Sequence, residues 1–193
     1  MEHFILEKQV LCRKDCKRII NFFESHEKFQ HVAFNALGVV DLNLKDCTQM
    51  SPNFRDSKYD FVNNIIFKAL ENIKHDYIEK YSFLDNNRIK WMKWDITAGY
   101  NIQKYNPGQA YHALHIENAG DEGTERRVLV WMIYLNTVND GGGTYFDHYD
   151  KIIKAEEGKG VLWPAYWTHP HKGIESETET KYIATGWYEF MPG

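Results

Sequence analysis

Cysteine, proline and long apolar runs are scarce in this sequence. It contains three cysteines and five prolines among 193 residues, and a small, odd number of cysteines does not describe the disulfide framework of a small secreted domain. No apolar stretch approaches the roughly 20 residues that cross a bilayer as a helix. Residues 1–10 carry neither a basic leader nor a long apolar segment. These absences predict a reduced, cytoplasmic protein that does not span a membrane.

An excess of positive charge is also missing. The 23 basic residues are outnumbered by 27 acidic ones, which leaves a formal net charge of −4 and a pI of about 6.1. Broad binding to nucleic acid depends on a basic face that displaces counterions, so the composition carries no strong nucleic-acid signal. Low-complexity tracts are absent as well, which argues against extended disorder.

Apolar and aromatic residues are plentiful, at 43% and 15% of the chain. A chain of this length buries roughly 70% of the surface that its unfolded form exposes, which is enough for a core. We therefore expect a single domain over residues 1–193, with a helical support in residues 1–88 and a β-rich core in residues 89–193.

The N-terminal support contains two stretches with helical periodicity. The first is capped by Asp15, and the second runs from about Tyr59 to Tyr81 with one apolar and one charged face. Between them, Val39–Leu44 is typical of a short strand, whereas Asp46–Asp60 is a polar segment without periodicity. A loop of this length is unusual in a compact domain, and we expect it to act as a lid over the substrate.

Short segments rich in β-branched and aromatic residues follow, separated by Gly, Asn, Asp and Pro turns. The expected strands are Lys90–Thr97, Tyr100–Lys104, Tyr111–Glu117, Val128–Asn136, Thr144–Asp147, Lys151–Lys154, Gly160–Trp163, His169–Gly173 and Lys181–Phe190. They predict an α+β fold with a mainly β core, namely a double-stranded β-helix (jelly roll) with the N-terminal helices packed outside its major sheet. The apolar run Val128–Leu135 predicts a central strand that is buried on both faces.

A candidate metal site lies in this β-rich part. His115 and Glu117 are two positions apart, so on a strand their side chains point to the same face. A third ligand must come from elsewhere in the fold, and His169 or His171 can supply it. Two imidazoles and one carboxylate on one face of an octahedral ion, with three positions open, are typical of non-haem Fe(II) oxygenases. His-x-Glu alone is a weak signal, because half-exposed strands often show it.

The residues around this pair resemble the Fe(II)- and 2-oxoglutarate-dependent dioxygenases, specifically their prolyl 4-hydroxylase-like branch. The matching features run in the family's order from about residue 90 to residue 190 and are Tyr105-Asn106-Pro107-Gly108-Gln109, His115-Ile116-Glu117, Arg127, Ile133-Tyr134-Leu135-Asn136, Gly141-Gly142-Gly143-Thr144-Tyr145-Phe146, Gly158-Lys159-Gly160, and His171 followed by Lys181. Their common order and spacing make the resemblance specific. The chain departs from the family at Glu117, where Asp is usual.

The resemblance implies the residues of the site. The metal ligands are His115, Glu117 and His171. His171 is preferred to His169 because the family's basic residue follows the distal ligand by about ten positions, where Lys181 stands. Lys181 is implied to bind the distal carboxylate of 2-oxoglutarate, an ion pair that is strong in an apolar pocket when it is also hydrogen-bonded. The further residues implied at the cosubstrate are Tyr134, Tyr105 and Thr144, and those implied at the substrate are Arg127 and Trp187.

The implied reaction uses Fe(II), 2-oxoglutarate and O2, with ascorbate as an optional reductant. It decarboxylates 2-oxoglutarate to succinate and CO2 while it hydroxylates a substrate. A peptidyl proline or a similar side chain is the default substrate, which makes a peptide or protein the expected partner. A small molecule, a sugar or a nucleobase stays open as an alternative, and so does a non-catalytic metal-binding jelly-roll module. A cupin-type barrel would place a second histidine where Glu117 stands.

Overall fold

The computed structural model describes residues 2–34, 38–89 and 92–191. Its strands are β1 (Leu6–Gln9), β2 (Gln30–Val32), β3 (Thr48–Met50), β4 (Trp94–Tyr105), β5 (Arg127–Tyr134), β6 (Thr144–Phe146), β7 (Lys151–Ile153), β8 (Lys159–Pro164), β9 (His171–Gly173) and β10 (Lys181–Phe190). The α-helices are α1 (Arg13–Ser25) and α2 (Asp60–Lys80), and short 3-10 helices lie at Glu27–Phe29, Ser57–Tyr59, Ser82–Leu84 and Asp147–Tyr149.

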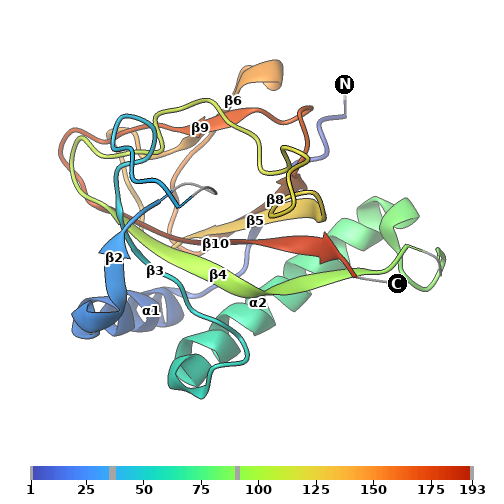
Figure 1. Cartoon of the computed structure of the whole chain (residues 1–193), viewed down its shortest axis with the longest axis horizontal. Coiled ribbons are helices and arrows are strands. Elements are labelled where there is room, and N and C mark those ends of the chain that lie inside the picture. Colours follow the sequence, from blue (N-terminus) through green and yellow to red (C-terminus); the bar gives the residue numbers. More distant parts are fainter. Residues whose placement is uncertain (1, 35–37, 90–91, 192–193) are drawn as a thin grey trace.

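Two antiparallel sheets form the β part of the structure (Figure 1). The strand order is β1-β8-β5-β10-β4-β3-β2 in the major sheet and β7-β6-β9 in the minor sheet. The longest ladder joins β10 to β4, from Lys181 opposite Tyr105 to Phe190 opposite Trp94. The predicted double-stranded β-helix with a mainly β core is confirmed.

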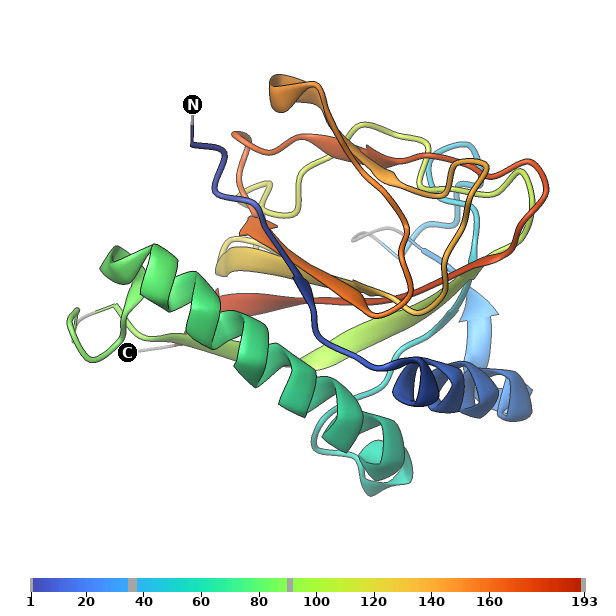
Figure 2. The ribbon, with the colours of Figure 1, turned by 180° about the vertical axis from the view of Figure 1, so that it is seen from behind.

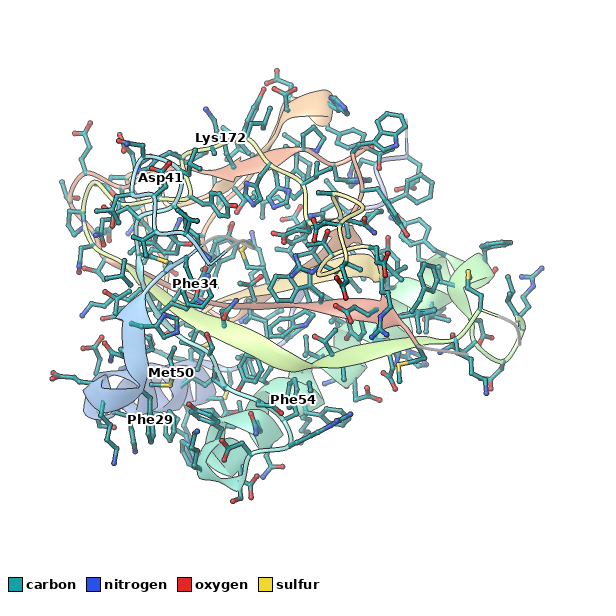
Figure 3. The ribbon with its side chains drawn as sticks, in the orientation of Figure 1. Phe29, Phe34, Asp41, Met50, Phe54 and Lys172 are labelled. Atoms are coloured by element: carbon teal, nitrogen blue, oxygen red, sulfur yellow. The ribbon has the colours of Figure 1, made fainter. Side chains whose placement is uncertain are left out.

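Both α-helices pack on one face of the major sheet, and the minor sheet lies on its other side (Figure 2). The side chains of Phe29, Met50 and Phe54 lie on the helix side (Figure 3). The predicted arrangement, with the N-terminal helices outside the major sheet, is therefore confirmed. No helix in the described ranges is long and apolar enough to cross a membrane.

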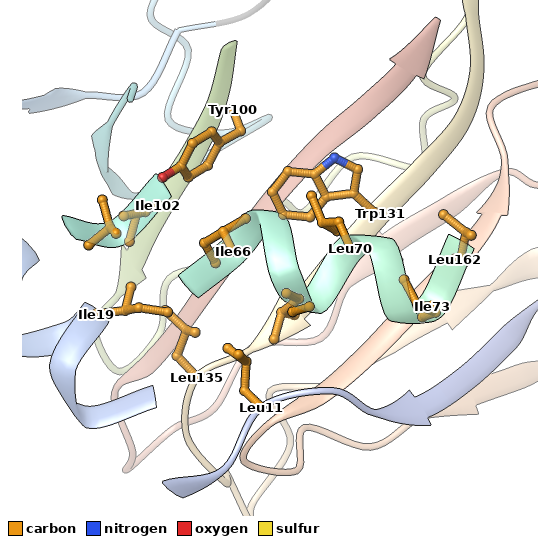
Figure 4. Close-up of a cluster of buried hydrophobic side chains, with 14 of the residues drawn as sticks. Leu11, Ile19, Ile66, Leu70, Ile73, Tyr100, Ile102, Trp131, Leu135 and Leu162 are labelled. Carbon is orange, nitrogen blue, oxygen red and sulfur yellow. The ribbon is translucent and has the colours of Figure 1, made fainter. Parts of the chain in front are cut away.

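The face of α2 that contacts the sheet is apolar. Ile66, Leu70 and Ile73 are at most 1% exposed and belong to one cluster with Trp131 and Leu162 of the sheet (Figure 4). Their spacing of three or four residues places them on the same side of a helix. Since full burial of such a side chain contributes about 1.5–3 kcal/mol relative to exposure, this layer is the principal apolar core.

The helix boundaries differ in how well the sequence predicts them. α2 begins and ends within one residue of the predicted Tyr59–Tyr81. Asp15 is not the cap of α1, because that helix already begins at Arg13. Asp15 instead lies in the first turn, where a carboxylate interacts favourably with the helix dipole, and its Oδ1 lies 2.9 Å from Arg18 Nη1.

Strand β5 has two apolar faces, as the run Val128–Leu135 predicts. Trp131 and Ile133 belong to the cluster on the helix side, whereas Met132 and Tyr134 belong to the cluster between the sheets. All four side chains are at most 6% exposed. Successive residues of a strand point to opposite faces, so β5 contributes to both cores at once.

The strand predicted at Val39–Leu44 is wrong. Leu44 donates its N–H to the carbonyl of Asp41, at 3.1 Å, and closes a turn instead of a ladder. The side chains of Val40, Leu42 and Leu44 are between 41% and 52% exposed. In the described part of the chain these three residues belong to no strand ladder, and an apolar run alone cannot supply one.

The loop predicted at Asp46–Asp60 is wrong at Thr48–Met50, which form β3 and pair with β4. Strands β1 and β2 are also missed by the sequence pattern, because each is only three or four residues long and lies at an edge of the sheet. The role of Asp46–Asp60 as a lid stays a prediction. The residues Thr48–Met50 near its start are held by the hydrogen-bonded ladder to β4.

Two further strand predictions need correction. Lys90–Thr97 and Tyr100–Lys104 are predicted as separate strands, but Trp94–Tyr105 is one continuous strand, and Lys90 lies outside the described residues. Tyr111–Glu117 is not a regular strand. It makes isolated bridges only at Tyr111, with Lys45, and at His115, with His171.

Candidate metal and cosubstrate site

His115, Glu117 and His171 converge on one point between the two sheets. Their ligand atoms all lie within 4.8 Å of one another. Glu117 Oε1 lies 3.5 Å from His115 Nε2 and 3.7 Å from His171 Nε2. His115 and Glu117 are two positions apart, whereas His171 is distant from them in the sequence, and each of the three side chains is largely buried.

The backbone explains why these side chains meet. His115 and His171 form a β-bridge in which each N–H donates to the other carbonyl, at 3.0 and 2.9 Å. Glu117 is held in turn by its N–H, which donates to the carbonyl of Ala165 at 3.1 Å. The predicted convergence is thus correct for the residues, but a bridge to β9 produces it instead of a strand at Tyr111–Glu117.

Each imidazole is oriented by a backbone carbonyl. His115 Nδ1 lies 2.9 Å from the carbonyl of Ala113, and His171 Nδ1 lies 2.9 Å from that of His169. A protonated Nδ1 at each carbonyl leaves Nε2 as the lone-pair donor, which is the usual arrangement of a metal-binding histidine. Burial, together with the neighbouring His171, lowers the pKa of His115 and so favours the neutral ring that a metal requires.

Aromatic rings fix both histidines from the side. The ring of Tyr111 stacks on His115 with 3.6 Å between the ring centroids and 10° between the planes. Phe146 and Trp163 pack against His171, with centroid distances of 5.5 and 5.1 Å. This packing limits rotation of the imidazoles and keeps Nε2 directed at Glu117.

His169 takes no part in the cluster. Its Nε2 lies 2.8 Å from the carbonyl of His3 and its Nδ1 lies 2.8 Å from Thr168 Oγ1. Both ring nitrogens therefore have partners outside the site, although the backbone carbonyl of His169 orients His171. The structure places the side chain of His171 beside Glu117, whereas His169 contacts the cluster only through its backbone carbonyl.

The second carboxylate oxygen of Glu117 has its own donors. Trp187 Nε1 donates to Oε2 at 2.9 Å, and Arg127 Nη1 donates to the same atom at 3.3 Å. Arg127 also lies over the ring of Trp187, 3.8 Å from its centroid. Glu117 thus presents Oε1 to the histidines, while Oε2 accepts hydrogen bonds from Trp187 and Arg127.

Burial raises the pKa of Glu117, but His115 and His171 outweigh burial and hold that pKa well below its usual range. The carboxylate therefore stays ionised in its enclosed position. Two imidazoles and one carboxylate, with open space beside them, fit an Fe(II) ion that keeps free positions for other ligands. The structure thus brings the three predicted residues together, and their role as metal ligands stays a prediction.

The cluster opens into a cavity of about 310 Å³ between the sheets. Lys181 lines the same cavity and is 5% exposed. Its Nζ lies 4.6 Å from the centroid of the Tyr105 ring and donates to the carbonyl of Ile174 at 3.5 Å. Lys181 forms no ion pair with any residue in the described part of the chain, so a buried cation is left without a counter-charge.

Burial lowers the pKa of Lys181 to about 8. An unpaired ammonium is costly in a low-dielectric interior, and an anionic ligand removes that cost. The residues present therefore fit a dicarboxylate such as 2-oxoglutarate, with one end at the metal ligands and the other at Lys181.

The three further residues implied at the cosubstrate also line this cavity. The hydroxyls of Tyr134 and Thr144 lie 2.7 Å apart, and Tyr134 also donates to the carbonyl of Ile153 at 3.3 Å. Tyr105 donates to Gln103 Oε1 at 2.8 Å. Their predicted contacts with 2-oxoglutarate stay predictions, because each hydroxyl already has a partner within the protein.

Arg127 and Trp187 are predicted at the substrate, and both line the cavity. Their hydrogen bonds nevertheless go to Glu117, so their position supports the metal ligand first. The sequence reasoning missed Tyr111 and Lys45. The spacing of Tyr111 could have indicated it, because it is four positions before His115 and alternation along the chain would place both side chains on the same face. Nothing in the sequence distinguishes Lys45.

Residues 100–189 match the sequence model of the family described as the 2OG-Fe(II) oxygenase superfamily. This range includes His115, Glu117, His171 and Lys181. No curated protein matches the sequence.

Several solved structures share the fold. The chain is similar to a viral collagen prolyl hydroxylase from Paramecium bursaria Chlorella virus-1, solved with 2-oxoglutarate, at 18% identity and a TM-score of 0.67 over 97% of each chain. It is similar to a prolyl-4-hydroxylase from Pseudomonas putida at 16% identity and a TM-score of 0.69, over 97% of this chain and 93% of the other. A prolyl hydroxylase from Trichoplax adhaerens, solved with a peptide fragment of the hypoxia inducible factor oxygen degradation domain, matches at 16% identity and a TM-score of 0.72 over 97% and 84%.

Residues 100–189 thus match the 2OG-Fe(II) oxygenase superfamily, whose members use Fe(II) and 2-oxoglutarate. The resemblance inferred from the sequence motifs is confirmed at this level, and so are the two cofactors. At identities of 16–18% the prolyl hydroxylase structures establish the fold of this chain but not its substrate.

Proposed function

We propose that this 2OG-Fe(II) oxygenase hydroxylates a peptidyl proline or a similar side chain. The observation that carries the oxygenase chemistry is the position of the His115–Glu117–His171 cluster and the buried Lys181 on the walls of one cavity. The finer assignment draws on the fold shared with prolyl hydroxylases, one of which was solved with a peptide. A small-molecule substrate is the alternative outcome of the test below.

The metal would be held by His115 Nε2, His171 Nε2 and Glu117 Oε1. When bound, iron and 2-oxoglutarate supply the O2-dependent oxidation that couples decarboxylation to hydroxylation of a C–H bond. The protein fixes three ligands on one side and leaves the cavity side free. Trp187 and Arg127 hold Glu117 Oε2 and so discourage the carboxylate from turning both oxygens toward the ion.

Lys181 would bind the distal carboxylate of 2-oxoglutarate at the inner end of the cavity. Tyr134 and Thr144 lie on the cavity wall with their hydroxyls 2.7 Å apart, and a small rotation of either hydroxyl offers a donor to the same carboxylate. Apolar side chains, among them Met132, Trp163 and Ile183, complete this part of the wall. They exclude water from the reacting groups, which strengthens the ion pair with Lys181.

The oxygenase proposal is tested with the full chain under anaerobic conditions. Addition of Fe(II) and 2-oxoglutarate should produce a visible metal-to-ligand charge-transfer band. If a folded sample gives no band, the chain is a jelly-roll module without oxygenase chemistry.

The substrate is tested by a screen of peptides and metabolites for a mass gain of one oxygen that is matched by succinate. Oxygen gain on proline-containing peptides supports the finer proposal. Oxygen gain confined to small molecules, sugars or nucleobases would replace the peptide substrate while leaving the oxygenase assignment intact.

A further inference from the structure

A second lysine lines the cavity and has no role in holding the metal or 2-oxoglutarate. Lys45 Nζ donates to Gln49 Oε1 at 3.1 Å. Within the described ranges it makes no ion pair with a carboxylate, and burial lowers its pKa. Its single hydrogen-bond partner there is a neutral amide, so its positive charge is left uncompensated.

Lys45 lies near the proposed metal ligands on the wall of the cavity. Its Nζ lies 5.5 Å from the centroid of the Tyr111 ring, and that ring stacks directly on His115. A β-bridge between Lys45 and Tyr111 fixes the two backbones against each other. The charge of Glu117 also acts on Lys45 and favours its protonated form. One aromatic ring therefore separates this ammonium from a metal ligand.

A row of polar side chains continues the wall from Lys45 along β3 and β4. Gln103 Nε2 donates to Gln49 Oε1 at 2.8 Å, and Gln49 Nε2 donates to Ser51 Oγ at 3.2 Å. Ser51 in turn donates to Asn101 Oδ1 at 2.9 Å. Gln49 and Gln103 are each 3% exposed. Amides buried this deeply, in a wall that faces a cavity, suit a polar ligand better than an apolar one.

2-Oxoglutarate does not account for Lys45. It has two carboxylates, and the metal ligands and Lys181 already provide for both. Lys181 stands opposite Tyr105 in the ladder between β10 and β4, whereas Lys45 bonds to Gln49, which stands opposite Gln103. The two lysines thus lie beside different residues of β4 on the cavity wall. Lys45 is therefore available to bind a second anionic ligand.

We propose that Lys45, with the amides of Gln49 and Gln103, binds a carboxylate of the substrate that is oxidised at this site. This inference rests on the proposed oxygenase function. The carboxylate can belong to an acidic residue or C-terminus of a peptide, or to a free amino acid. In each case the anion is held beside Tyr111, on the same side of the cavity as His115, and it directs a nearby C–H group toward the metal.

The test uses the full chain with Fe(II) and 2-oxoglutarate and two pairs of probes that differ in one charge. One pair is a proline-containing peptide with glutamate beside the proline and the same peptide with glutamine. The other pair is L-proline and L-prolinamide. Binding is measured anaerobically by calorimetry, and turnover is measured by oxygen incorporation and succinate. The variants are Lys45→Met and, as a matched control, Lys172→Met, which removes an exposed lysine of β9 (Figure 3).

We expect the carboxylate member of at least one pair to be preferred by about tenfold or more, the size of a charge-assisted hydrogen bond. Lys45→Met should remove this preference by weakening the carboxylate member alone, and Lys172→Met should keep it. The pair that shows the effect identifies the source of the carboxylate. The inference would be overturned by any of three results. These are equal use of both members of each pair, failure of both carboxylate probes to bind, and a preference that persists in Lys45→Met.

Two further readouts separate this inference from the proposed function. If Lys45→Met weakens 2-oxoglutarate about as much as Lys181→Met does, Lys45 is a cosubstrate residue and the inference is wrong while the oxygenase stands. If the unmodified chain gives no charge-transfer band with Fe(II) and 2-oxoglutarate, the proposed function itself fails.

Discussion

The two faces of the major sheet carry different chemistry on alternating residues of the same strands. On β10, Ala184 and Tyr188 point to the helices and belong to the apolar core, whereas Lys181 and Thr185 point to the cavity. On β4, Ile102 belongs to the helix side, and its neighbours Asn101 and Gln103 line the cavity. One face is therefore closed by α1 and α2, and the other is covered only in part by the minor sheet.

The difference shows how stability and function are separated in this fold. Apolar burial on the helix side contributes the free energy that keeps the strands in register. The cavity side can then hold Lys181, a buried cation that pairs with no carboxylate among the described residues and therefore costs free energy without a ligand. Substitutions on the two faces should therefore have different consequences.

The largest effect is expected for His171→Ala on the cavity side. Loss of one of three ligands should abolish the charge-transfer band with Fe(II) and 2-oxoglutarate and reduce turnover below detection, because two remaining ligands no longer define the metal face. His148→Ala, which removes an exposed histidine of the short helix Asp147–Tyr149, should keep both. A band of normal intensity in His171→Ala would refute the choice of ligand.

Leu70→Ala tests the helix side. Leu70 is 1% exposed on α2, and its truncation should lower the free energy of unfolding by about 2–5 kcal/mol, as for other buried leucines. Denaturant unfolding measures this loss, and the band should keep its intensity in buffer. Phe67→Ala on the same helix should cost much less, since Phe67 is 46% exposed. If Leu70→Ala removed the band from protein that is still folded, the two faces would not be independent.

Lys181→Met should weaken 2-oxoglutarate by about a hundredfold, the upper range for a hydrogen bond to a charged group. The matched control is Lys104→Met. Lys104 stands opposite Tyr182, one position along the same ladder, but points to the helix side and pairs with Glu24 at 3.0 Å. Titration of the charge-transfer band measures both variants. Comparable losses of affinity in the two would show that the effect is not specific to the cavity.

The affinity for 2-oxoglutarate should also depend on pH. Burial lowers the pKa of Lys181 to about 8, so its ammonium is present below that pH and is lost as the pH rises through it. The affinity should stay level from pH 6.5 to about 7.5 and then fall by up to about tenfold per pH unit above 8. Lys181→Arg should flatten this profile, because a guanidinium stays charged. A level profile in the unmodified protein would contradict a lysine with a lowered pKa.

The smallest effect is expected for Trp187→Phe, which removes the N–H that donates to Glu117 Oε2. The affinity for Fe(II) should fall by about tenfold, as for other groups that orient a metal ligand. Competition with a chelator measures it. Trp167→Phe is the control, since Trp167 is 70% exposed. An unchanged affinity for Fe(II) in Trp187→Phe would show that Trp187 does not support the metal site, and its predicted role in binding substrate would remain.

Long periodic segments were predictable. The apolar spacing of α2 and the apolar run of β5 persist over enough residues to define a face, and both predictions are confirmed. Two short strands, β2 at the edge of the major sheet and β3 beside it, were not predicted, because three residues are too few to show a periodic pattern. The mistaken strand at Val39–Leu44 has a related cause, since a short apolar run does not show that the chain turns there and leaves Val40, Leu42 and Leu44 exposed.

By itself the sequence determined which residues are proposed as ligands, their order and the basic residue that follows them, because these properties depend on motif and spacing alone. Only the tertiary structure decided that His115 and His171 meet through a β-bridge, that Trp187 and Arg127 hold Glu117, and that Lys45 reaches the same cavity. Such contacts join residues that are distant along the chain. No local pattern records them, because they follow from the pairing of strands and the closure of two sheets around one cavity.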